Sequence, residues 1–379
     1  MIEICNMKEC TGCGLCASSC TKKSITMKSI DNFGHLYPVI DQNSCVDCGL
    51  CRKVCPSLHP RFKQLPLQCF AAWSKDEEDY KSSTSGGAAS VLSHYIINHG
   101  GVVYGCAMLS DVDVKHVRID NLAELGKLKG SKYVQSIITH ILPLVKKDVK
   151  EGRDVLFIGT PCQCAAVKSL FKEQPKNLYI VDLICHGVPS LRFLQKHIVK
   201  VAGTIHVDNV KFRDATGMYL LVVVDGKIRY KRALREPRYD DLYFNTFFDG
   251  YTYRESCYMC KFASPERAFD ITIGDFWGLG KETSTAEIPA HKYGCSVMLP
   301  SSESGLKLVE SVSSLINLYP RAVDEAVCGN AQLRSPFKMT WRIKLFRWLV
   351  RNGVTPEIYR LLILDKNIKF KLRKLIKGK

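Results

Sequence analysis

Eight of the eighteen cysteines in this 379-residue chain stand in two runs of identical spacing. Each run reads Cys-x2-Cys-x2-Cys-x3-Cys, first over residues 10–20 and again over residues 45–55. Three such thiolates can hold one face of a [4Fe–4S] cubane, while the fourth cysteine ligates the neighbouring cluster. Zinc is disfavoured because its sites are built from separate Cys-x2-Cys pairs. We therefore predict one cluster on Cys10, Cys13, Cys16 and Cys55, and a second cluster on Cys45, Cys48, Cys51 and Cys20.

Cys5 lies outside both runs and is expected to be a small buried hydrophobe.

A further set of cysteines lies where the strands of an α/β core are expected to end. Cys162 follows a buried-strand pattern at the start of a helix, and Cys185 follows the next such strand. The carboxyl ends of parallel strands meet at one edge of a sheet, where ligands gather. Two alternatives stay open, because Cys164 is a rival ligand and scattered cysteines are often inert core residues. The candidate ligands of a third cluster are Cys162, Cys185, Cys257 and Cys260.

Two short loops combine small, hydroxyl and cationic residues. Residues 83–87 run directly into a helical pattern over 88–98, and exposed N–H groups at a helix N-terminus favour an anion such as phosphate. An N-cap serine followed by flexible glycines explains the same pattern equally well. Residues 130–133 are compatible with a second ligand loop or with a solvated turn. The candidate cofactor-binding residues are Ser83, Thr84, Ser85, Gly86, Gly87, Ser131, Lys132 and Tyr133.

The chain divides into five segments. Residues 1–60 carry the cysteine runs with a hairpin pattern between them, and prolines mark a stiff linker over 61–68. Segments 69–150 and 151–329 alternate buried-strand and helix patterns, as an α/β core does. The expected fold is an α+β ferredoxin-like two-cluster domain, then a mixed α/β domain, then a basic helical tail over 330–379.

Most of the net charge of +17 belongs to that tail. Residues 334–379 contain fourteen Lys or Arg and two acidic residues, a net charge of +12. A helix is expected there from the spacing of Trp341, Leu345, Trp348 and Leu349. Such a helix can lie on an anionic lipid surface or dock on the protein's own core. Nucleic acid is disfavoured because Trp and Leu interleave with Lys and Arg.

The N-terminus has neither the basic nor the apolar region of a secretory signal, and no apolar run reaches the roughly 20 residues of a spanning helix. We therefore expect a cytoplasmic protein. The basic tail is also compatible with peripheral contact at the inner face of the membrane.

A series of motifs follows the two-cluster unit in the order Ser-Thr-Ser-Gly-Gly, Gly-Ser-Lys-Tyr-Val, Gly-Thr-Pro-Cys-Gln, Cys-His-Gly, a Cys-x2-Cys pair and Gly-Asp-Phe-Trp-Gly. Together these motifs resemble those of the coenzyme F-420 hydrogenase/dehydrogenase beta subunit family (FrhB/FdhB-like). The resemblance covers roughly residues 1–300 and leaves out the basic tail.

The resemblance implies an iron–sulfur flavoenzyme. It implies FAD at loops 83–87 and 130–133, an additional cluster on the later cysteines, and hydride exchange with deazaflavin F-420 or another organic acceptor. A flavin exchanges two electrons as hydride whereas each cluster carries one. The expected route runs from a redox partner, such as a ferredoxin or a hydrogenase/dehydrogenase subunit, through the clusters to FAD and then to the small-molecule substrate.

A competing hypothesis is a ferredoxin-type electron carrier without flavin, and some proteins of this family are associated with surface-polysaccharide genes. No catalytic residue is assigned. His186 is the nearest candidate for a general acid, and a structural histidine explains it as well. Asp275 is compatible with positioning a flavin or substrate, or with closing a turn.

Overall fold

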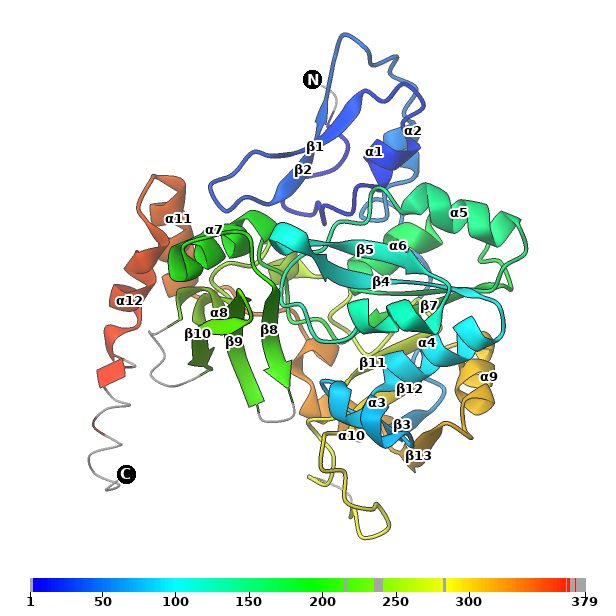
Figure 1. The fold of residues 1–379 in the computed structure, drawn as a ribbon. Helices are drawn as coiled ribbons and strands as arrows, with labels where there is room; N and C mark the ends of the chain where they lie inside the picture. The colour runs from blue at the N-terminus through cyan, green and yellow to red at the C-terminus, as the bar shows by residue number, and fades with distance from the viewer. Residues whose placement is uncertain are drawn as a thin grey trace.

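The computed structural model describes residues 3–214, 217–234, 241–281, 284–365, 367–368 and 372. Its N-terminal unit is small and rich in turns. Two short helices, α1 (Leu15–Ser19) and α2 (Leu50–Lys53), flank the antiparallel hairpin of β1 (Ile25–Ser29) and β2 (Leu36–Ile40). The hairpin was expected from the sequence and is confirmed. Figure 1 shows this unit in blue, against the larger body beside α5 and α6.

The body is built on one mixed sheet with the strand order β13-β3-β12-β11-β7-β6-β4-β5. The four central strands β4, β6, β7 and β11 pair in parallel, and antiparallel strands extend the sheet on both sides. The predicted mixed α/β fold is confirmed. The strands are β3 (Cys69–Ser74), β4 (Val102–Leu109), β5 (Asp113–Ile119), β6 (Val155–Gly159), β7 (Leu178–Leu183), β11 (Ile271–Asp275), β12 (Ser296–Pro300) and β13 (Ile316–Arg321).

Strands from both predicted segments, 69–150 and 151–329, therefore belong to this one sheet.

Helices cover both faces of the sheet. Alternate residues of β6 face opposite ways: Phe157 packs with α5 (Leu142–Lys150) and α6 (Pro161–Lys168), and Leu156 packs with α4 (Ala88–Asn98) and α9 (Glu303–Ser311). Alternation of this kind follows from the two-residue period of a strand, and burial on both faces explains why β6 reads as a continuous apolar run. The remaining short elements of the body are α3 (Glu77–Ser82), η1 (Ser110–Val112), η2 (Leu122–Lys127), η3 (Glu255–Met259), α10 (Val323–Gly329) and η4 (Ala331–Leu333).

A second, three-stranded antiparallel sheet lies beside the main one. It contains β8 (Asn209–Asp214), β9 (Gly217–Val224) and β10 (Lys227–Ala233), in the order β10-β9-β8. Helices α7 (Leu191–Ala202) and α8 (Leu242–Phe248) cover its apolar side. The hairpin of β9 and β10 turns at Asp225-Gly226.

The tail forms helices α11 (Trp341–Arg351) and α12 (Tyr359–Leu362), joined through η5 (Pro356–Ile358). Helix α11 is docked on the body through Ile343, Phe346, Arg347 and Val350. Two of the residues whose spacing predicted this helix lie on its solvent side, since Trp341 is 66% and Trp348 is 61% exposed. The rest of the predicted tail helix, residues 366, 369–371 and 373–379, lies outside the described residues.

Within the described part of the chain, no helix is both long enough and apolar enough to cross a membrane.

Candidate functional site

The structure brings the four predicted ligands of the first cluster together around one cavity, lined by Cys10, Cys13, Cys16 and Cys55. Two glycines between them adopt the left-handed conformation, with φ of +67° at Gly12 and +75° at Gly14. A Cβ on Gly12 would lie 2.6 Å from the guanidinium of Arg254. Glycine is therefore required at position 12 both by the backbone and by the close approach of this arginine.

Cys5 also faces this cavity, so it has more contact with the site than a packing residue would. Its thiol hydrogen-bonds with Cys10 and Cys55, and this donation is the largest cause that lowers the pKa of each of these two thiols to about 6. The nearby charge of Arg254 lowers the pKa of Cys10 further. Iron is bound by thiolates, so thiols that ionise easily suit ligand positions.

Cysteines of the second run are less buried than those of the first. Burial is the main cause that raises the pKa of Cys51. The charges of Cys45 and Cys48 raise it further, so the three thiols lie close together. Cys48 is exposed, whereas Cys10, Cys16 and Cys55 are buried. Cys20 directly follows α1, which packs against α2. The two predicted cluster sites thus differ in access to solvent.

The later cysteines form a third group. Cys162, Cys185, Cys257 and Cys260 line a single cavity at the carboxyl ends of β6 and β7 and in the 255–260 turn. Burial raises the pKa of all four thiols, to about 12 at Cys257. Their charges also raise one another's pKa, which shows that they lie close together.

The rival ligand Cys164 lies elsewhere, buried in the core with its thiol donating to the Val181 carbonyl at 3.4 Å.

Across the described residues, no group of three or more His, Cys, Asp or Glu side chains is arranged to hold a single metal ion.

The first and third cysteine groups are neighbours. Thr11, Pro56 and Ser57 of the N-terminal unit line the same cavity as the four later cysteines. The charge of Cys162 acts on the pKa of Cys13, although burial is the main reason that the pKa of Cys13 rises to about 12. The side-chain amide of Gln135 also ties the two parts together, because it donates to the Thr11 carbonyl at 2.9 Å.

The two predicted cofactor loops meet at the N-terminus of α4. Thr84 Oγ1 and Ser131 Oγ are hydrogen-bonded at 3.2 Å. No side chain caps α4, whose N-cap Gly87 has a φ of +82°. A Cβ on Gly86 would lie 2.0 Å from the Ala72 carbonyl oxygen, so only glycine fits between α4 and β3.

The other side chains of these loops are engaged by the protein itself. Ser83 donates to the Asp79 carbonyl and Ser85 to the Cys295 carbonyl. The buried ammonium of Lys132 donates to four main-chain carbonyls, those of Cys106, Lys127, Leu128 and Lys129. Lys132 thus closes the end of η2 and is not a free cation.

Two family profiles match the chain. A 4Fe-4S dicluster domain matches residues 9–58, and the profile for the C-terminal part of the coenzyme F420 hydrogenase/dehydrogenase beta subunit matches residues 152–324. The chain belongs to this beta subunit family. It is an iron–sulfur electron-transfer protein of an oxidoreductase family, as the motifs indicated.

Among solved structures, this family member is similar to a chain of the xenon-derivatised F420-reducing [NiFe] hydrogenase complex from Methanosarcina barkeri. The two chains are 20% identical, the match covers 83% of this chain and 94% of that one, and the TM-score is 0.47. No curated protein matches in the sequence search.

In this beta subunit family member, a set of polar residues connects the loops with the third cysteine group. Burial is the main cause that raises the pKa of Tyr133, and the charge of Asp275 raises it further. Arg213 and a hydrogen bond with Ser131 lower it. Arg213 forms an ion pair with Asp275 at the end of β11. His186 directly follows Cys185 in the chain. Burial lowers the pKa of this histidine, and the charge of Asp275 acts in the opposite direction.

Sequence reasoning missed Arg213 and Arg254, because each is a single arginine far in the sequence from its partners.

Proposed function

We propose that this chain is an iron–sulfur flavoprotein oxidoreductase that passes electrons between a redox partner protein and an organic hydride donor or acceptor. The observation that carries the proposal is the shared cavity, in which the N-terminal cysteine unit lies against Cys162, Cys185, Cys257 and Cys260. A carrier that only exchanged electrons at its surface would not require a second group of converging thiols behind its first cluster site.

The order of the sites from the surface inward supports this proposal. In the Cys45–Cys51 group Cys48 is exposed and the other two cysteines are partly buried, so a partner can approach this group. The Cys10–Cys55 group is buried against the body, and the third cysteine group lies next to it. His186, Asp275, Arg213 and Tyr133 then lead to the cofactor loops.

We propose that the three cysteine groups hold three clusters, each with four cysteine ligands. When bound, clusters carry single electrons and a flavin exchanges two as hydride. The chain's own part is to supply thiolates at Cys10 and Cys55, whose pKa is already lowered, and to hold the four later thiols around one cavity.

We propose that the cofactor loops take the phosphate end of FAD. Helix α4 has eleven residues, and its N-cap Gly87 makes no side-chain hydrogen bond to the first turn, so we propose the N–H groups of that turn as the anion site. Thr84 and Ser131 stand beside that end, joined to each other. Lys132 would hold the second loop in shape rather than meet the phosphate. We take the deazaflavin F-420 or a related organic hydride acceptor as the substrate class, on the family resemblance.

Quantitation of iron, sulfide and flavin in anaerobically purified protein tests the proposal. We expect about twelve iron atoms, as three cubanes require, and one FAD. Cys257→Ser should lose about four iron atoms, whereas the matched control Cys164→Ser should keep all of them because Cys164 lies in the core. About eight iron atoms and no flavin in the wild-type protein would instead support the ferredoxin-type carrier.

The outer face of α11 favours a second, separate role in contacting an anionic lipid surface. Trp341, Leu345 and Trp348 are exposed on it, and Lys344 and Arg351 lie beside them. Exposed tryptophans flanked by basic residues are typical of helices that lie in a membrane interface.

A further inference from the structure

A completely buried arginine lies between the first and third cysteine groups. Arg254 is 1% exposed, and its guanidinium stacks over the ring of Tyr37 with 4.2 Å between the guanidinium carbon and the ring centroid. Its position on the chain is three residues before Cys257, and the Cys257 N–H donates to the Arg254 carbonyl at 3.0 Å. The same residue therefore contacts the third group through its main chain and the first group through its side chain.

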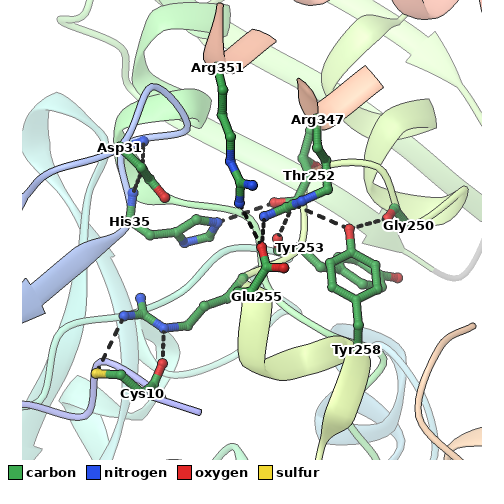
Figure 2. A network of polar contacts seen from close by, with 12 residues as sticks. Cys10, Asp31, His35, Gly250, Thr252, Tyr253, Glu255, Tyr258, Arg347 and Arg351 are labelled. Atoms are coloured by element: carbon green, nitrogen blue, oxygen red, sulfur yellow. Dashed lines mark hydrogen bonds and ion pairs between the residues drawn. The ribbon is translucent and has the colours of Figure 1, made fainter. Parts of the chain in front are cut away.

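The side-chain contacts of Arg254 are directed at Cys10. Nε donates to the Cys10 carbonyl at 2.7 Å, and one terminal nitrogen lies 3.9 Å from the Cys10 sulfur. The guanidinium also donates to the Leu36 carbonyl at 2.6 Å and to Gln135 Oε1 at 3.1 Å. Cys10 and its sulfur are seen at the lower left of Figure 2. Arg254 thus fixes the main chain of a predicted ligand and faces its sulfur.

Among the described residues, no carboxylate forms an ion pair with Arg254. Glu255, its neighbour in sequence, is held instead by Arg347 at 2.6 Å and Arg351 at 2.8 Å, as Figure 2 shows. His35, from the N-terminal unit, adds no negative charge, and burial keeps its pKa well below the usual range. Isolated buried charges are costly, so native proteins pair them with an opposite charge.

A [4Fe–4S] cluster on four thiolates supplies that opposite charge. Such a site carries a net charge of about −2 when oxidised and about −3 when reduced, since four thiolates surround a core of +2 or +1. One added electron therefore makes the site one unit more negative. A fixed positive charge beside it stabilises the reduced state more than the oxidised state.

We propose that Arg254 is the buried counter-charge of the cluster on Cys10, Cys13, Cys16 and Cys55, and that it raises the reduction potential of this cluster relative to the one on Cys45, Cys48, Cys51 and Cys20. This inference rests on the proposed function, because it requires the first cluster to be present. It goes further by assigning to a residue of the α/β body the control of a cluster in the N-terminal unit. Electrons arriving at the exposed group are thereby favoured to move inward.

A redox titration monitored by electron paramagnetic resonance tests this assignment in the full-length, anaerobically purified protein. Arg254→Gln should lower the equilibrium constant for reducing the first cluster at least tenfold, which is about 59 mV for a one-electron couple. Arg254→Lys, which keeps the charge, should recover most of that shift. The second cluster should keep its potential, and Cys48→Ser identifies its signal by removing one of its predicted ligands.

Arg347→Gln is the matched control. Arg347 is as deeply buried and belongs to the same network, but its nitrogens contact Tyr253, Tyr258 and Glu255 and no predicted ligand. Its substitution should shift the potential of the first cluster less than Arg254→Gln does. An unchanged potential in Arg254→Gln, or an equal shift of both clusters, overturns the assignment.

Iron content decides the case in which Arg254→Gln does not retain the first cluster. Retention of that cluster in Arg254→Lys but not in Arg254→Gln supports a requirement for charge. Loss in both variants overturns it, because the fork geometry of the arginine would then be what matters. Wild-type protein without iron would overturn the proposed function itself, and this inference with it.

Discussion

Removing the ring of Phe346 should detach α11 from the body, and removing the ring of Trp348 should not. Phe346 is 0% exposed and packs against Phe33 at 6.2 Å and against Tyr251 at 5.2 Å between ring centroids. Truncating a buried phenylalanine to alanine costs about 3–5 kcal/mol. Trp348, two residues further along the same helix, is 61% exposed, and a substitution at such a surface site changes stability by about 0.5 kcal/mol or less.

Hydrogen–deuterium exchange of peptides from α11 measures this difference directly. Since every 1.4 kcal/mol is tenfold in an equilibrium constant, Phe346→Ala should speed exchange by roughly two to three and a half powers of ten, up to the limit of full local opening. Trp348→Ala should change it by about threefold at most. Peptides from α4, on the far side of the body, serve as the internal reference. Equal loss of protection in the two variants would refute the placement of Phe346 on the inner face.

Two further predictions concern one buried histidine and two exposed tryptophans. Burial lowers the pKa of His116 to about 4, so below pH 6.5 the unfolded chain binds a proton that the folded chain does not. His116 alone should therefore lower stability by up to about 3 kcal/mol as the pH drops from 6.5 to 4. In urea unfolding, His116→Gln should lose this part of the pH dependence. Replacing Trp341 and Trp348 together by serine should weaken sedimentation with phosphatidylserine vesicles at low salt, and unchanged binding would reject the lipid contact.

The grouping of the first and third cysteine sets could be predicted because it is local in sequence or follows from strand ends. Three thiols of the first run lie within seven residues, and Cys162 and Cys185 follow β6 and β7, which pair in parallel. Both signals depend only on short-range geometry. The alternation of buried strands and helices predicted the α/β body for the same reason.

Other features depend on contacts that no local pattern encodes. Helix α11 carries large apolar residues on both sides, so its spacing alone does not tell which side faces the core; the fit of Phe346 between Phe33 and Tyr251 decides it. Lys132 reads as a free cation in a loop, yet the carbonyls that hold it come from η2 and β4. Arg254 reads as an ordinary charged residue in a turn.

The contact between Arg254 and Cys10 also bears on the order in which the protein matures during synthesis. The two residues are 244 positions apart in the chain. At about 5–20 residues per second, a ribosome that has just made Cys55, the last predicted ligand of the first cluster, needs roughly 10–40 s more to reach the arginine. A cluster assembled on the nascent N-terminal unit would spend this interval with its inner side uncovered. Iron delivery after release of the finished polypeptide would avoid that exposure to oxygen.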